Sequence, residues 1–250
     1  MKKISFFCKK GGVGKTSLAV NVAYYIATEL NKKTIIIDAD PQGNASEGLC
    51  KGQKINQYQL IDVINSIVSP AEALSQYNEN LFYLKTEGKG SELREDSDIV
   101  INKQRYFFED LNDDLDKQGF DVAIYDLSPN FGILERGVVI TLDEIISPFM
   151  PEKFGMSGLL ALAMDIKKMN KNERRNVKHE SVVINNKNST MSSHEIVSEL
   201  FEEMNYKIFT IPQDSKIKDS QLLGKPLYEV FPKAKAMSAF IQISKAIVGE

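Results

Sequence analysis

The feature that most constrains the fold is a glycine-rich loop near the N-terminus, Lys9-Lys10-Gly11-Gly12-Val13-Gly14-Lys15-Thr16-Ser17. It follows an apolar run that is typical of a strand and precedes a stretch with helical periodicity. Glycines let backbone amides approach phosphate oxygens closely, and the start of a helix adds unpaired amides and the positive end of its dipole. The spacing therefore predicts a phosphate-binding loop of the Walker A type.

Each part of such a loop has a defined task. The ammonium of Lys15 would bind the β- and γ-phosphates, and the hydroxyl of Thr16 would coordinate Mg²⁺. The loop departs from the general motif at its first glycine, which is Lys9 here, and Lys10 stands directly before the glycine pair. The predicted nucleotide-binding residues of the loop are Lys10, Gly11, Gly12, Val13, Gly14, Lys15, Thr16 and Ser17.

Short apolar runs alternate with helix-length segments along the chain. Several are continuous, such as Ile35-Ile36-Ile37, and continuous runs fit strands of a parallel sheet that is buried on both faces. Residues 16–30 repeat apolar side chains about every four positions, as an amphipathic helix does. We therefore predict one α/β domain over residues 1–250, a doubly wound, mostly parallel sheet flanked by helices, with a polar surface excursion at 86–104. The candidate strands are residues 3–8, 33–38, 81–85, 120–126, 144–149, 181–185 and 207–211.

Acidic residues stand at the ends of two candidate strands. Asp38 and Asp40 belong to the string Asp38-Ala39-Asp40-Pro41-Gln42-Gly43-Asn44, and Asp126 ends the strand at 120–126. The carboxyl ends of parallel strands form the ligand edge of such sheets. A carboxylate at the position of Asp126 is the Walker B pattern, which predicts a metal site residue. For the Asp38 string, a helix cap and a turn are an equally good interpretation.

Composition excludes several classes of protein. The longest apolar runs, such as residues 159–164, are far shorter than the about 20 residues of a membrane span, so we expect no integral membrane association. Only Cys8 and Cys50 are present, without a Cys-x-x-Cys pair, which argues against a disulfide framework or an iron–sulfur cluster. We therefore expect a cytoplasmic protein.

Taken together, residues 10–16 and 38–44 resemble the ParA/Soj partition ATPases of the ParA/MinD group, whose phosphate loop is a deviant Walker A motif. The resemblance runs along nearly the whole chain and implies ATP as the nucleotide, Mg²⁺ as the metal, and slow, partner-stimulated hydrolysis. Later segments similar to the family are Asp126-Leu127-Ser128-Pro129-Asn130, Pro151-Glu152-Lys153-Phe154, Ile211-Pro212-Gln213-Asp214 and Gly224-Lys225-Pro226-Leu227.

The resemblance also implies a homodimer with ATP sandwiched between the subunits. Lys10 matches the signature lysine and would reach the phosphates of the partner, much as an arginine finger does. Asp40 would orient or activate the attacking water, so Lys10, Lys15 and Asp40 are the catalytic candidates. Thr16, Asp38 and Asp126 are the metal candidates, with Asp38 supporting Mg²⁺ or its water shell.

Base recognition is implied by the same resemblance. Asn185 ends the strand at 181–185, at a position where family members often contact adenine. Pro212 and Asp214 follow the next strand and would line the base pocket. For Asn185, a simple turn of the chain is an equally good interpretation.

ParA proteins bind DNA nonspecifically as ATP dimers, which requires clustered cations. Residues 1–150 carry 16 basic and 22 acidic side chains, whereas residues 151–250 carry 15 and 12, so an anionic partner is expected on the second part. A further cluster at 167–178 has six cations and one acid, and each cluster can equally be a solvated surface. The candidate DNA contacts are Lys216, Lys218, Lys233 and Lys235, although Gln213 stands where typical members carry an arginine.

The function implied by the resemblance is segregation or positioning of chromosome or plasmid DNA, with a ParB-like activator and nucleoid association. Two alternatives stay open. A MinD-like membrane-associated ATPase needs a basic amphipathic helix, but residues 234–250 have only Lys235 and Lys245 as cations, and we expect them to form the last core helix. The other alternative is a ParA relative that positions a protein cargo.

Overall fold

The computed structural model describes residues 1–50, 56–87, 93, 106–151, 155–187 and 192–250. Most of the excursion predicted at 86–104 lies outside these ranges. Residues 152–154 of the family-like segment at 151–154 also lie outside them.

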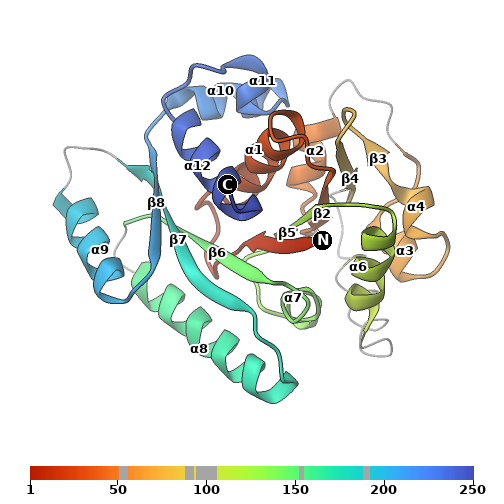
Figure 1. Ribbon diagram of the computed structural model, residues 1–250, viewed down its shortest axis with the longest axis horizontal. Coiled ribbons are helices and arrows are strands. Elements are labelled where there is room, and N and C mark those ends of the chain that lie inside the picture. The colour runs from red at the N-terminus through yellow and green to blue at the C-terminus, as the bar shows by residue number, and fades with distance from the viewer. Residues whose placement is uncertain (51–55, 88–92, 94–105, 152–154, 188–191) are drawn as a thin grey trace.

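A central sheet organises the molecule (Figure 1). In the described ranges it has eight strands in the order β3-β4-β2-β5-β1-β6-β7-β8. β3 runs antiparallel to β4, and the other neighbouring pairs are parallel, which confirms the predicted class. The strands are β1 (Lys2–Phe6), β2 (Thr34–Ala39), β3 (Ser75–Gln76), β4 (Leu81–Leu84), β5 (Val122–Leu127), β6 (Glu144–Phe149), β7 (Lys178–Lys187) and β8 (Lys207–Pro212).

Helices cover both faces of the sheet (Figure 1). One face carries α1, α2, α10, α11 and α12, and the other carries α3, α4, α6, α7, α8 and α9. Their bounds are α1 (Lys15–Thr28), α2 (Asn44–Cys50), α3 (Leu60–Ile64), α4 (Pro70–Ala73), α6 (Phe107–Lys117), α7 (Ile133–Val139), α8 (Gly155–Glu173), α9 (Ser192–Glu203), α10 (Ser215–Leu223), α11 (Leu227–Val230) and α12 (Met237–Val248).

The continuous apolar runs are explained by burial on both faces. In β2, Ile36 packs toward α1 and α12, whereas Ile35 and Ile37 pack into the opposite core. All three are fully buried. Successive side chains of a strand point to opposite faces, so each face of a covered sheet requires apolar residues.

The last helix, α12, is a core helix, as expected. Its apolar side chains, among them Met237, Phe240, Ile243 and Ile247, are buried in the cluster that contains α1. None of the helices in the described ranges combines the length and apolar character that crossing a membrane requires.

The parallel arrangement brings the predicted ligand groups to one edge. β1 leads into the phosphate loop (residues 9–16), and the ends of β2 and β5 are in register, with Asp38 opposite Asp126. β2 ends at Ala39, so Asp40 lies beyond the strand in a turn, where it no longer follows the alternation of the strand.

Candidate functional site

The phosphate loop has the backbone that a phosphate site needs. Gly12 and Gly14 have φ values of 72° and 97°, a left-handed conformation that strongly favours glycine. A Cβ on Gly14 would clash with Nδ2 of Asn185, so a side chain there would also require Asn185 to move. Because α1 begins at Lys15, the unpaired amides of its first turn point toward the space in front of the loop.

Lys15 is folded back along this loop. Its side chain is buried, with 7% of the residue exposed, and its ammonium donates to the carbonyl oxygen of Lys10 at 2.9 Å. A buried ammonium bound to a single backbone carbonyl has donors left for phosphate oxygens. Lys15 therefore lies where a phosphate-binding lysine is needed.

Thr16 and Asp126 form the part of the site that fits a metal ion. The hydroxyl of Thr16 donates to Oδ2 of Asp126 at 2.7 Å. The other oxygen, Oδ1, is buried and has no hydrogen-bond partner in the described part of the chain. A buried carboxylate oxygen without a partner is unfavourable unless a cation or a bound water meets it.

Electrostatics agree with a cation at this point. Burial raises the pKa of Asp126 well above its usual range, and the neighbouring charge of Asp38 adds to the rise. A divalent ion would offset both effects because it stabilises the charged carboxylates. Mg²⁺ prefers oxygen ligands, commonly one or two carboxylates together with substrate phosphates, so Thr16 and Asp126 fit this ion.

Asp38 has a different environment at the end of the neighbouring strand. Its Oδ2 accepts the backbone amide of Ser46 at 2.7 Å and the Ser46 hydroxyl at 2.6 Å, and its Oδ1 accepts the amide of Asp40 at 3.3 Å. Burial raises the pKa of Asp38 to about 7, while the two bonds from Ser46 lower it. Both oxygens of Asp38 are thus held by protein donors.

Asp40 faces the open side of the site. Its Oδ1 accepts the amide of Gln42 at 2.9 Å, which closes the turn that follows β2. The side chain is 7% exposed and lines the cavity in front of the phosphate loop. Asp40 is therefore placed to contact a ligand bound in that cavity.

The cavity has a volume of about 960 Å³, at the upper end of the range for small-molecule sites. It begins at the phosphate loop, passes along α1 and α2, and reaches the corner between α10 and α11. Its lining residues are Gly11, Gly12, Gly14, Lys15, Thr16, Ser17, Val20, Asn21, Asp40, Gln42, Asn44, Glu47, Gly48, Pro129, Ser220, Gln221, Leu222, Gly224 and Lys225.

The three predicted base contacts lie outside this lining. Asn185 donates its amide to the carbonyl of Val13 at 2.8 Å and so supports the loop from behind. Asp214 caps α10, accepting the amides of Lys216 at 3.0 Å and Ala236 at 3.1 Å, and Pro212 ends β8. In this conformation the cavity instead reaches Gln221 and Leu222, which the sequence interpretation did not single out, and Lys225, which it named only within a family-like segment.

Lys10 lies at the rim of the loop. It is half-buried, its carbonyl binds Lys15, and it is not among the residues that line the cavity. Its neighbour Lys9, where the general motif has glycine, forms an ion pair with Asp165 on α8 and lies over the ring of Phe131 at 4.8 Å. Lys9 thus ties the loop to α8.

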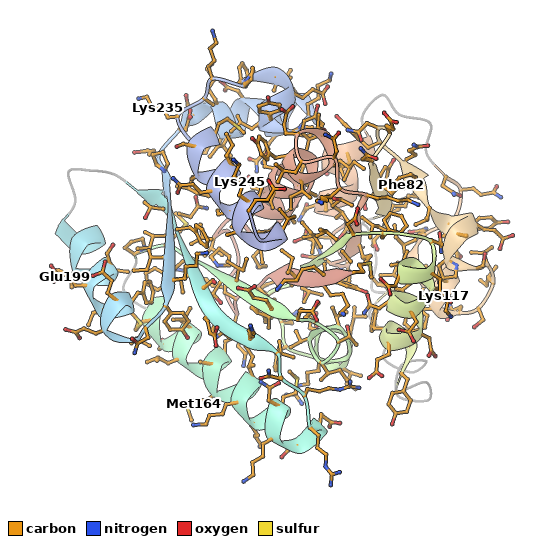
Figure 2. All side chains as sticks on the ribbon, in the orientation of Figure 1. Phe82, Lys117, Met164, Glu199, Lys235 and Lys245 are labelled. Atoms are coloured by element: carbon orange, nitrogen blue, oxygen red, sulfur yellow. The ribbon has the colours of Figure 1, made fainter. Side chains whose placement is uncertain are left out.

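The candidate DNA contacts are all exposed and lie on α10 or in the segment between α11 and α12. Lys216 pairs with Asp219 at 2.9 Å and lies over the ring of Phe231 at 4.7 Å, so its charge is partly compensated. The second basic cluster, at 167–178, covers the end of α8, the loop before β7 and the first residue of that strand. The two clusters are on opposite sides of the molecule, near the labelled Lys235 and beyond the labelled Met164 (Figure 2).

Comparison with known proteins agrees with this geometry. The family model described as "AAA domain" matches residues 1–179. The chain is 30% identical to the uncharacterized protein BBD21 of Borreliella burgdorferi, covering 99% of each chain. It is 25% identical to the chromosome-partitioning ATPase Soj of Treponema pallidum, covering 99% of this chain and 97% of Soj.

Solved structures show the same fold. Apo McdA of Cyanothece superposes with a TM-score of 0.84 at 20% identity, with all of both chains covered. The septum site-determining protein MinD of Pyrococcus horikoshii, in complex with Mg-ADP, gives a TM-score of 0.79 at 20% identity, covering 98% of this chain and 95% of MinD.

Proposed function

Because the chain belongs to the AAA-domain family and, within it, to the ParA/Soj-type ATPases, we propose that it hydrolyses ATP with Mg²⁺ at the cavity in front of the phosphate loop. The observation that carries this proposal is the buried Oδ1 of Asp126 beside Thr16, which has no hydrogen-bond partner among the residues that the structure describes. This oxygen lies at the start of α1, where the phosphates of a nucleotide and their metal ion would bind.

The reaction transfers the γ-phosphoryl group to water. A bond forms between the water oxygen and the γ-phosphorus, the bond from phosphorus to the β,γ-bridging oxygen breaks, and ADP, inorganic phosphate and a proton result. Mg²⁺, when bound, neutralises charge that develops on the β- and γ-phosphates. Lys15 and the loop amides stabilise the same charge, and Asp40 orients the attacking water.

A homodimer would complete the site. Lys10 lies at the rim of the loop and outside the cavity lining of its own subunit. This position is compatible with contact to a nucleotide held by a second copy, where an added cation would stabilise the charge of the transition state. Dimerisation would then depend on ATP and would end with slow, partner-stimulated hydrolysis.

The ATP-bound dimer would bind DNA nonspecifically and, with a ParB-like activator, segregate or position chromosome or plasmid DNA in the cytoplasm, on the nucleoid. Four exposed lysines, Lys216, Lys218, Lys233 and Lys235, support this proposal by their shared position at one corner of the molecule. Positioning of a protein cargo by the same ATP switch is the second candidate. A MinD-like membrane role finds less support because the apolar face of α12 is buried.

One binding experiment separates these roles. A gel shift with duplex DNA and a sedimentation assay with anionic liposomes are run with ATP, with ADP and over a series of salt concentrations. We expect DNA binding only with ATP, with affinity falling steeply as salt rises. Liposome binding without DNA binding would favour the membrane role, and binding to neither would favour a protein cargo.

Matched lysine variants locate the DNA surface. The double variant Lys233→Ala, Lys235→Ala should weaken DNA binding and reduce the salt slope by about 1 for each lysine that contacts a phosphate. The control is Lys167→Ala, Lys168→Ala on α8, which removes the same charge from the other side of the molecule. An equal loss in both variants would contradict a defined surface at α10 to α12.

A further inference from the structure

Three buried residues form a closed hydrogen-bonded ring at the end of β2. Asp38 accepts the hydroxyl of Ser46 at 2.6 Å, and that hydroxyl oxygen accepts the backbone amide of Thr86 at 2.8 Å. The hydroxyl of Thr86 donates to the backbone carbonyl of Asp38 at 2.6 Å and closes the ring. The residues, here called the Asp38 ring, are 1%, 4% and 4% exposed.

The ring joins three separate elements. Asp38 belongs to β2, Ser46 to the first turn of α2, and Thr86 follows the end of β4. The amide of Ser46 also donates to Asp38, so the carboxylate fixes where α2 begins. Water is largely excluded at this burial, and polar networks that are fully satisfied under such conditions hold their members rigidly.

The ring also reaches Asp40. The backbone amide of Asp40 donates to Oδ1 of Asp38. In the turn that follows, the amide of Gln42 donates to the side chain of Asp40, and the amide of Gly43 donates to the carbonyl of Asp40. Asp40 lines the cavity, whereas Asp38 and the rest of the ring do not. The orientation of Asp40 therefore depends on groups that lie outside the lining of the cavity.

We infer that Ser46 and Thr86 are positioning residues for hydrolysis, because the ring they form with Asp38 holds the Asp40 turn at the distance that the attacking water requires. The inference rests on the proposed ATPase activity. It assigns Asp38 to this ring, whereas Asp126, one oxygen of which has no partner in the described part of the chain, is the carboxylate that would face the metal. Misplacement of a catalytic group by about 1 Å can lower the rate by about 100-fold.

Four variants test the ring against matched controls. Ser46→Ala removes a buried hydroxyl that is bound to Asp38. Its control is Ser181→Ala in β7. Ser181 is 4% exposed, as Ser46 is, and its hydroxyl donates to Glu144 at 2.9 Å. Thr86→Val removes a buried hydroxyl bound to a backbone carbonyl. Its control Thr34→Val removes one bound to the carbonyl of Lys32 at 2.8 Å, at the opposite end of β2.

Steady-state kinetics give the first readout. We expect Ser46→Ala and Thr86→Val to lower kcat by about 10- to 100-fold, with KM for ATP changed by no more than about two-fold. Thr86→Ser keeps the hydroxyl and should restore kcat to near the wild-type value. The two control variants should keep wild-type kcat. A normal kcat in the ring variants, or an equal loss in the controls, would overturn the inference.

Hydrogen exchange gives a readout that does not depend on turnover. In the nucleotide-free protein, the amides of residues 40–43 should exchange faster in Ser46→Ala than in Ser181→Ala. If the wild-type chain released no phosphate from ATP, the proposed ATPase activity would fail, and the exchange result alone would decide on the ring. Unchanged exchange at residues 40–43 would contradict the inference in either case.

Discussion

The ends of β2 and β5 place two buried carboxylates side by side in register, and the two differ in their bonding. The carboxylate of Asp38 accepts three hydrogen bonds from the chain. Two come from the backbone amide and the hydroxyl of Ser46, and the third comes from the backbone amide of Asp40. Asp126 receives one, from Thr16, and keeps a buried oxygen without a partner in the described residues. We call Thr16 and Asp126, where we propose that Mg²⁺ binds, the metal-facing edge and contrast it with the Asp38 ring.

The difference shows how one sheet edge serves two tasks. A buried polar group that has no hydrogen-bond partner in the protein destabilises the ligand-free fold, and a ligand that supplies the partner binds more tightly for that reason. A buried polar group that is already hydrogen-bonded within the protein makes the structure rigid and adds little to the affinity for a ligand. We therefore expect substitutions at the metal-facing edge and the phosphate loop to change binding, and those at the ring to change folding and turnover.

The largest expected effect is the loss of ATP binding in Lys15→Ala. The ammonium of Lys15 is buried at the loop, and its removal eliminates a charge-assisted contact to the phosphates. We expect affinity to fall by about 100-fold or more, measured by equilibrium dialysis with labelled ATP and Mg²⁺. The control Lys9→Ala removes a loop lysine that pairs with Asp165 and should bind ATP normally. Unchanged affinity in Lys15→Ala would refute the assignment of the loop.

The next effect is a loss of hydrolysis without loss of binding in Asp40→Ala. Asp40 lines the cavity, and its backbone amide is bound to Asp38 of the ring. The variant therefore tests a residue that connects the Asp38 ring with the ligand cavity. We expect phosphate release to fall by about 100-fold and an ATP-bound dimer to accumulate. Light scattering with ATP and Mg²⁺ should report a doubled mass. A persistent monomer would contradict the role given to Asp40.

A smaller effect concerns the free energy of unfolding in the absence of nucleotide, which we expect to respond differently to Asp38→Asn and to Asp126→Asn. Asp38→Asn presents an amide to donors that need an acceptor, and we expect a loss of about 2 kcal/mol in the free energy of unfolding. Asp126→Asn replaces a buried carboxyl group that has one oxygen without a partner among the described residues, and should be neutral or stabilising. Urea unfolding of the two variants checks this. Equal destabilisation would erase the distinction between the two carboxylates.

The smallest effect is a dependence of stability on pH. The pKa of Asp38 is raised from 3.8 to about 7 in the folded protein. Between these values the folded state binds more protons than the unfolded state, so the Asp38 contribution to stability is greatest at low pH and is lost as pH rises through 7.

Comparing the wild type with Asp38→Asn isolates the contribution of Asp38 to the pH dependence of stability. From pH 5 to 7 we expect the unfolding free energy of the wild type to decline relative to Asp38→Asn by at most on the order of 1 kcal/mol per pH unit. Urea unfolding without nucleotide measures the difference. An opposite slope would mean that the hydrogen bonds from Ser46 outweigh burial.

The local motifs of the site could be predicted from the sequence because each is contained in a short segment. The phosphate loop, the Asp38 string and Asp126 all lie at strand ends, and β6 has the predicted bounds. The two-residue β3 was not predicted because it carries no apolar pattern. Elsewhere strand ends differ from the predicted ones by at most three residues, as at β7, which begins at Lys178.

The distinction between Asp38 and Asp126 could not be predicted, because it depends on residues far along the chain. Ser46 is eight residues and Thr86 is 48 residues from Asp38. A polar residue after an apolar strand was a usable signal at Thr86, but its partner depends on the pairing of β4 with β2. The same limit applies to the extent of the cavity, which reaches Lys225 at a corner where α11 packs against both α1 and α10.

The most direct test is a calorimetric titration of ATP into the wild-type chain, once with Mg²⁺ and once with EDTA. If the metal-facing edge binds a cation together with the phosphates, affinity should be at least about ten-fold higher with Mg²⁺, and Asp126→Asn should remove that difference. Equal affinity in the two buffers, or no binding in either, would contradict the account.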